Sequence, residues 1–242
     1  KSNMKNKKVL VSITSASDPN GWVEKVRRIS ELGIEEAALF PTMLDGEQRT
    51  KLYAALEKSS IKRLPHVHLR SDMEEWEVDL FIEKYDTQVF NIHPLHCSHP
   101  FSEGFSKYKT RIFIENLIEI PEEAELNKYA GLCVDFGHWE GSVRLGNTDY
   151  DDRMRQLIKK FPIGCCHIPA VKKKVERDAE FPKRFTFDQH FMDELSDLDY
   201  VKKYKDFLPQ YISIELENSI DEQLEAKKYL EEGHFPPGSM GP

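Results

Sequence analysis

The stretch Arg111-Ile112-Phe113-Ile114-Glu115 places three apolar residues directly in front of a glutamate. Tyr211-Ile212-Ser213-Ile214-Glu215 repeats this arrangement near the other end of the chain. Short runs of β-branched and aromatic residues predict buried strands. A carboxylate at the end of a buried strand is costly unless a partner neutralises it, and a divalent metal does so well. The two stretches therefore predict strands that end at a metal site.

The rest of the chain alternates short apolar runs with longer amphipathic stretches. The expected strands cover residues 9–14, 36–40, 63–69, 88–93, 111–116, 132–136, 164–168 and 211–217. The expected helices cover residues 21–32, 46–58, 73–85, 122–129, 150–161, 199–207 and 220–232. Such alternation predicts right-handed crossovers and a parallel sheet. Eight parallel strands close most simply into a barrel, and 242 residues suit a single (β/α)8 TIM barrel of the α/β class.

No linker-like change in composition divides the chain, so we expect one barrel domain over residues 9–232. Residues 1–8 are expected to be an N-terminal extension or a cloning remnant, and residues 233–242, rich in Gly and Pro, a flexible tail. The stretch 169–197 is basic and then acidic, and it is expected to be an irregular loop over the barrel mouth. Long loops at that place are often functional.

The composition limits the function classes. Charged residues make up 31% of the chain, and the net charge of -8 disfavours extended nucleic-acid binding, although bound metals would offset part of it. Of four cysteines, Cys133, Cys165 and Cys166 lie in expected strands, which is typical of reduced thiols in an intracellular protein. No apolar run has membrane-spanning length and no secretory signal opens the sequence, so we expect a cytoplasmic protein without a membrane partner. Oligomerisation stays open.

Residues that bind metals recur where the expected strands end, which is where barrel active sites lie. They are His66 or His68, His93, Glu115, Asp135, His138, His167, Asp188, His190 and Glu215. His66 and His68 share one strand face, so spacing does not choose between them. Glu217 shares a face with Glu215, but it could equally pair with a lysine of a neighbouring helix. His96 and His99 lie in a polar loop and are expected to be solvated.

Four of these candidates carry the metal prediction. Glu115, Asp135, His167 and Glu215 would place a costly group at the same level on four strands. Mixed oxygen and nitrogen ligands suit a divalent metal, zinc or manganese first, with cobalt or magnesium as alternatives. A phosphate could be bound by basic residues of the loop, although a solvated basic loop is the simpler reading. These residues are Lys172, Lys173, Lys174, Arg177, Lys183 and Arg184.

Four short motifs give the chain a resemblance to the xylose isomerase-like superfamily of barrels, which includes sugar isomerases, epimerases and endonuclease IV. They are Ile114-Glu115-Asn116, Asp135-Phe136-Gly137-His138, Cys166-His167-Ile168-Pro169 and Ile214-Glu215-Leu216-Glu217, in the family order. The resemblance implies that Glu115, Asp135, His167 and Glu215 hold the metal shared by isomerases and epimerases. It also implies that Glu115 and Glu215 are the catalytic residues that move the substrate proton.

Three further motifs resemble the endonuclease IV branch: Leu64-Pro65-His66, Asn91-Ile92-His93-Pro94 and Asp188-Gln189-His190. This resemblance implies a three-zinc site in which Glu115 bridges two ions. His66 and His93 would share one ion, and His138, Asp188 and His190 would hold a third. The chain departs from that branch after His190, where 191–196 (FMDELS) replaces a glycine-rich turn.

We therefore expect a metal-dependent isomerase or epimerase that acts on a small sugar or sugar phosphate through an ene-diolate intermediate. The alternative is an endonuclease IV-like phosphoesterase or AP endonuclease with two or three zinc ions, for which nucleic acid would be the partner. A third reading is a metal-binding barrel without catalysis.

Overall fold

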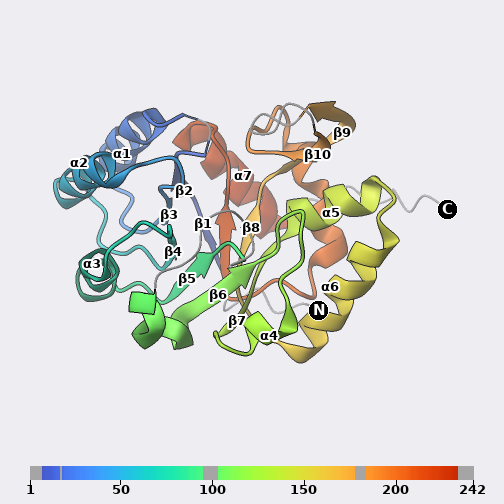
Figure 1. The fold of residues 1–242 in the computed structure, drawn as a ribbon. Coiled ribbons are helices and arrows are strands. Elements are labelled where there is room, and N and C mark those ends of the chain that lie inside the picture. The colour runs from blue at the N-terminus through green and yellow to red at the C-terminus, as the bar shows by residue number, and fades with distance from the viewer. Residues whose placement is uncertain (1–6, 17, 95–102, 178–183, 234–242) are drawn as a thin grey trace.

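The computed structural model describes residues 7–16, 18–94, 103–177 and 184–233 (Figure 1). The parallel strands are β1 Lys8–Leu10, β2 Ser12–Thr14, β3 Ala38–Phe40, β4 His66–His68, β5 Val89–Ile92, β6 Ile112–Glu115, β7 Gly131–Asp135, β8 Ile163–Ile168 and β11 Tyr211–Ile214. The helices are α1 Gly21–Leu32, α2 Gly46–Glu57, α3 Glu75–Tyr85, α4 Glu123–Leu126, α5 Phe136–Arg144, α6 Thr148–Lys160 and α7 Ile220–Glu232. Two 3-10 segments, η2 Glu103–Arg111 and η3 Leu195–Tyr204, and two further strands, β9 Ala170–Arg177 and β10 Phe185–Gln189, complete the described elements.

The nine parallel strands form one sheet that nearly closes on itself. Their order is β1-β11-β8-β7-β6-β5-β4-β3-β2, so β1 and β2 stand at its two ends. Only Val11 separates these two strands in the sequence, and its carbonyl accepts a hydrogen bond of 2.8 Å from the Ala38 amide. β1 and β2 thus correspond to the single strand expected over 9–14. The architecture fits a TIM barrel, as the sequence predicts.

The sheet separates an outer core from a narrow interior. Val67, Phe90 and Ile114 face outward into the main apolar cluster, which also contains helix residues such as Ile29 and Phe81. Figure 1 shows α1, α2 and α3 on one side of the sheet and α5 and α6 on the other. Inside, Phe113 packs so closely on β8 that a side chain at Gly164 would come within 2.1 Å of its ring. The Phe113 ring therefore fills the space beside β8 in the barrel interior.

The helix predictions are confirmed where strong end signals exist. α1 and α7 have the expected bounds; both end at a left-handed glycine, Gly33 or Gly233, and α7 begins at a Ser219 capping box. The expected helix 122–129 is a single turn, α4. The helix expected over 199–207 is instead η3, which begins four residues earlier behind a Glu194 capping box. β1 begins at Lys8, so this residue belongs to the sheet and not to the extension expected over residues 1–8.

The expectation of an irregular loop over 169–197 is wrong for Ala170–Arg177 and Phe185–Gln189, which form the strands β9 and β10. β9 and β10 pair antiparallel, with Phe185 opposite Arg177 and Gln189 opposite Ala170. Figure 1 shows this hairpin beside α5, with which β10 makes close contacts. No helix in the described part of the chain is both long and apolar enough to cross a membrane.

Candidate metal centre

Four strands bring Glu115, Asp135, His167 and Glu215 together at their carboxyl ends. Glu115 and Asp135 are the last residues of β6 and β7, His167 lies on β8 opposite Asp135, and Glu215 follows β11. One ligand atom of each residue lies within 4.8 Å of the corresponding atom of every other. All four are buried, with relative exposures of at most 5%. The group expected from the sequence therefore forms one compact, buried cluster.

The cluster contains polar atoms without hydrogen-bond partners. His167 Nδ1 lies 3.0 Å from Glu215 Oε2, 3.3 Å from Glu115 Oε1 and 3.9 Å from Asp135 Oδ2. Neither His167 ring nitrogen forms a hydrogen bond in the described structure, and Asp135 Oδ2 forms none either. Buried polar atoms are rarely left in this state. Three carboxylates and one imidazole with such orphaned atoms fit a divalent cation.

The charges of the cluster point the same way. Burial, together with the neighbouring Glu215 and Glu115 carboxylates, raises the pKa of Asp135 to about 7 against the opposing effect of His138 and His167. Burial disfavours the charged forms of Glu215 and His167 as well, but their mutual attraction outweighs it. The pKa of Glu215 falls to about 2, and the pKa of His167 rises well above its usual value. A proton on His167 thus neutralises the carboxylates, and a metal would compete with that proton.

His68, His93 and Glu115 form a second group whose ligand atoms lie within 4.8 Å of one another. The His68 Nδ1–H donates to the Leu69 carbonyl at 2.8 Å, so in the neutral ring Nε2 carries no hydrogen. Nε2 is buried without a hydrogen-bond partner and faces Glu115 Oε2 at 3.3 Å. Two acceptors this close need a cation or a proton between them. Because Glu115 Oε1 faces His167, its two oxygens point to different groups.

The structure separates His66 from His68. His66 Nδ1 lies 2.7 Å from Ser213 Oγ, and Nε2 lies 2.9 Å from Asn91 Oδ1, so both ring nitrogens are engaged. His68, and not the His66 that the endonuclease IV resemblance implies, thus contacts Glu115. One ligand atom each of His66, Cys133 and Cys165 lie within 4.8 Å of one another, but both His66 nitrogens are already hydrogen-bonded.

The third expected set, His138, Asp188 and His190, does not gather in the same way. His138 Nδ1 forms a 2.7 Å ion pair with Asp188 Oδ2, and the carboxylates of Asp188 and Asp135 raise the pKa of His138 to about 10 against the effect of burial. His190 Nε2 lies 3.8 Å from Glu215 Oε2. Among the described residues, this set is not one of the metal-capable groups of three or more.

Asp135 lies at the junction of β7 and α5. α5 begins at Phe136, directly after the strand, and Asp135 caps it by accepting a hydrogen bond of 2.7 Å from the His138 amide. Gly137 is needed in this helix because a side chain there would come within 2.3 Å of Pro169.

The remaining candidates have other partners. Glu217 accepts a hydrogen bond of 2.9 Å from the Lys25 ammonium of α1, which is the alternative that the sequence left open. Lys172 is buried, and its ammonium donates to Asp193 and Asp197 at 2.7 and 2.9 Å, so its charge is already neutralised. Lys173 pairs with Glu194, and the Arg177 guanidinium lies over the Phe185 ring. Lys183, His96 and His99 lie outside the described residues.

Polar residues that the sequence reading missed hold the cluster in place. Asn116 accepts from the Asp135 amide at 2.9 Å and donates to the Asp135 carbonyl at 3.0 Å, and it also donates to Tyr150 Oη. Asn91 donates to Glu115 Oε2 at 2.6 Å. Asn91 shares a strand face with His93, so its inward direction was readable from spacing, but its partner was not.

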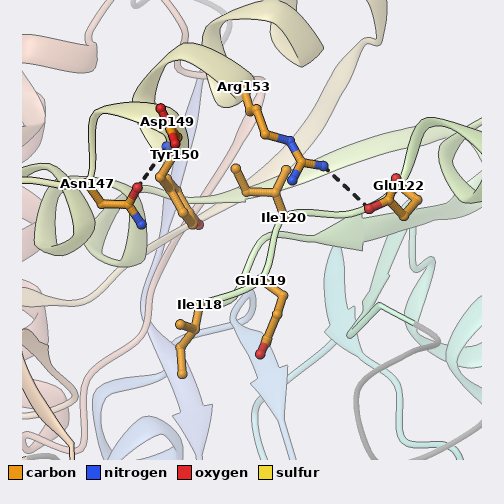
Figure 2. Close-up of a pocket in the computed structure, with 8 residues that line it drawn as sticks. All are labelled: Ile118, Glu119, Ile120, Glu122, Asn147, Asp149, Tyr150 and Arg153. Atoms are coloured by element: carbon orange, nitrogen blue, oxygen red, sulfur yellow. Dashed lines mark hydrogen bonds and ion pairs between the residues drawn. The ribbon is translucent and has the colours of Figure 1, made fainter.

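A pocket of about 290 Å³ lies apart from the cluster (Figure 2). Its walls come from the segment after β6 and from the beginning of α6, where Arg153 pairs with Glu122 at 3.5 Å. Tyr150 lines it and connects it, through Asn116, to the backbone of Asp135. None of the candidate metal ligands named above lines this pocket, so it is not part of the candidate metal centre.

Comparison with known proteins adds little to the site. No protein-family model and no curated protein matches the chain. An uncharacterized protein from Parabacteroides distasonis is 18% identical over 93% of this chain and 98% of its own, with a TM-score of 0.47. A xylose isomerase-like TIM barrel/4-hydroxyphenylpyruvate dioxygenase fusion protein is 12% identical over 97% of this chain and 45% of its own, with a TM-score of 0.48. These values are too low to carry a function across, and the chain spans less than half of the fusion protein.

Proposed function

We propose that the protein is a metal-dependent isomerase or epimerase that moves a proton on a small sugar or sugar phosphate. One observation carries the proposal: four buried ligand residues with orphaned polar atoms converge at the carboxyl ends of parallel strands. Glu115, Asp135, His167 and Glu215 would hold the ion. When bound, a divalent ion polarises a carbonyl and stabilises the negative charge that follows loss of the neighbouring proton.

Glu115 and Glu215 are the groups that would accept and return this proton. The ionised form is favoured for both, because the charge of His167 lowers their pKa values against the effect of burial. Neither carboxylate can swing freely, since Glu115 accepts from Asn91 and Glu215 lies against His167. Fixed carboxylates at hydrogen-bond reach of a substrate are what general acid–base catalysis requires.

Apolar packing keeps bulk water from the cluster. The Phe40 ring lies 4.8 Å from the His167 ring and 5.3 Å from the His66 ring, centroid to centroid, and it is fully buried. In such surroundings the attraction between opposite charges is stronger than at a surface. A small substrate that enters from the mouth would therefore meet a largely preorganised site.

A second candidate function is the zinc phosphoesterase or AP endonuclease. The observation that favours it is the second group, in which His68 Nε2 and Glu115 Oε2 face each other without a hydrogen bond. With one Glu115 oxygen toward each group, two ions could share this residue. Such a pair would position a nucleophile and neutralise charge on phosphorus. The third ion that the resemblance implies has no compact group in the described residues.

The test combines metal content with proton exchange. Chelator-treated protein is reloaded with Mn²⁺, Co²⁺ or Zn²⁺, and incorporation of deuterium from D2O into a panel of aldoses, ketoses and their phosphates is followed by NMR. We expect metal-dependent exchange that falls by about 10²–10⁴-fold in Glu215→Gln. Glu217→Gln is the matched control, since it makes the same change two residues away, and it should retain exchange.

The same preparations are assayed on a duplex with an abasic site. The phosphoesterase or AP endonuclease would replace the isomerase or epimerase if the protein binds two or three zinc ions, cleaves the strand and exchanges no sugar proton. One ion per chain with exchange and without cleavage is the result that we expect.

A further inference from the structure

We propose that Ser213, His66 and Asn91 form a directional hydrogen-bond chain that positions Glu115 for metal binding. The inference rests on the proposed function, in which Glu115 is a metal ligand, and it assigns to His66 a role that is not ligation. Asn91 contacts Glu115 directly, and His66 acts on Glu115 only through Asn91. We therefore treat His66 and Asn91 as positioning residues.

The direction of the chain follows from what each group can donate. An ionised carboxylate only accepts, so the Asn91 amide group turns its NH2 toward Glu115 Oε2, at 2.6 Å. The Asn91 oxygen then faces His66 Nε2 at 2.9 Å, and this nitrogen must carry the hydrogen. In the neutral ring Nδ1 is the acceptor, and the Ser213 hydroxyl donates to it at 2.7 Å. Every donor thus points toward Glu115.

The chain crosses the barrel interior, away from water. Ser213 lies on β11, His66 on β4, Asn91 on β5 and Glu115 at the end of β6. The first three are fully buried, and Glu115 is 2% exposed. Hydrogen bonds in a dry interior are stronger than in water, and aligned ones polarise each other. The series therefore fixes Glu115 Oε2 in one place, which leaves Oε1 directed at His167.

This arrangement explains the burial of His66. Among the hydrogen bonds and ion pairs of the described residues, none joins His66 to Asp135, His167 or Glu215. Groups that hydrogen-bond to metal ligands orient them, and their loss commonly lowers metal affinity by about 10–100-fold. His66 is thus expected to influence the metal through the orientation of Glu115. A glutamine at this position can still donate to Asn91, whereas a leucine cannot.

The test measures affinity for Zn²⁺ and Co²⁺ by calorimetry on the chelator-treated full chain, together with the thermal midpoint of each metal-free variant. We expect Asn91→Leu and His66→Leu to bind both ions about 10–100-fold more weakly. His66→Gln should restore most of the affinity, and Ser213→Ala should have the smallest effect. Val89 lies opposite His66 in the β4–β5 pairing and takes no part in the hydrogen-bond chain. Val89→Ala removes packing there and should lower only the thermal midpoint.

Nitrogen-detected NMR of the metal-free wild type adds a readout that needs neither metal nor activity, and it should find hydrogen on His66 Nε2. The proposal is overturned if His66→Gln binds as weakly as His66→Leu, which would make His66 a ligand. It is also overturned if the variants of Asn91, His66 and Ser213 all bind metal as tightly as the wild type, or if the ring of His66 carries hydrogen on Nδ1 alone. If the variants bind metal in the expected order but the wild type exchanges no sugar proton, the proposed function is refuted and the proposed hydrogen-bond chain stands. A wild type that binds neither ion would overturn both.

Discussion

Two buried charge clusters in this molecule are built in opposite ways. Between α2 and α3, Arg49 donates from Nε and Nη2 to the two oxygens of Glu77 at 2.8 and 2.9 Å, and Tyr53 donates to the same carboxylate. The Nη1 group of Arg49 also donates to the Leu44 carbonyl and to Asp72. At the barrel mouth, by contrast, three carboxylates surround one histidine, and several buried atoms have no hydrogen bond.

This difference in hydrogen bonding distinguishes a cluster that stabilises the fold from a candidate metal site. Where the fold needs a buried carboxylate, the chain supplies its own cation in a geometry that satisfies every charge. At the mouth it supplies too few donors, although the residues are equally buried. A cluster that the fold leaves incomplete is suited to a cation from outside. The comparison can be broken or sharpened by changing one cluster at a time.

The largest effect is expected from Arg49→Leu. This change leaves Glu77 buried without its cation, and breaking such a pair costs about 3–5 kcal/mol of the free energy of unfolding. Urea denaturation of the metal-free protein measures it, and Zn²⁺ affinity should stay unchanged in the fraction that folds. A loss of affinity equal to that of a ligand variant would mean that the two clusters are not independent.

Glu215→Gln should have the opposite profile. Removing one of four ligands is expected to weaken Zn²⁺ or Co²⁺ binding by more than the roughly hundredfold seen for residues that only orient a ligand. The metal-free protein should lose less stability than it does in Arg49→Leu, because the carboxylates of Glu115 and Asp135 stay beside His167 when that of Glu215 is removed. Calorimetry and urea denaturation on the same samples check both statements. Unchanged affinity would place the metal elsewhere.

A smaller effect is expected from pH. His167 carries a raised pKa, so near neutral pH it holds a proton that a metal must displace. Metal affinity should therefore rise with pH, by up to about tenfold per unit while one proton is released. Calorimetry in buffers of different ionisation enthalpy counts the protons. Affinity independent of pH between about 6 and 8 would show that His167 is not protonated before metal binds.

The smallest effect concerns Asp135 in the metal-free protein. Its folded pKa of about 7 exceeds the usual value of 3.8, so the folded state holds this proton more tightly than the unfolded chain. The stability that it contributes is present at low pH and is lost as pH rises through about 7. Asp135→Asn should remove this part of the pH dependence, as seen in the difference between the two unfolding curves. Parallel curves would contradict the raised pKa.

Local signals allowed much of the fold to be predicted. The expected bounds of 21–32 and 220–232 agree with α1 and α7, whose ends are marked by local features, the left-handed Gly33 and the Ser219 capping box. The β9–β10 hairpin was missed, because β9 is buried only in its first residues and then exposes Lys173 to Arg177, without an alternating apolar face. Its partner β10 follows it closely in sequence, with Phe185 opposite Arg177, so the pairing itself is local.

The site divides in the same way. Glu115, Asp135, His167 and Glu215 were predictable because each ends an apolar run, and parallel strands end at one edge. His66 and His68 were indistinguishable, since both face inward, and their roles depend on Asn91 of the neighbouring strand β5 and on Ser213 across the barrel. Lys172 looked available for a phosphate, but Asp193 and Asp197 are brought to it by η3 and the segment before it.

The central claim is that one divalent ion binds among four named side chains. Anomalous diffraction at the zinc edge, from crystals of Zn²⁺-loaded protein, tests it most directly. The account predicts a strong peak between Glu115, Asp135, His167 and Glu215, with His66 still bonded to Asn91 and Ser213. A peak at the His66, Cys133 and Cys165 group instead, or none within the barrel mouth, would contradict it.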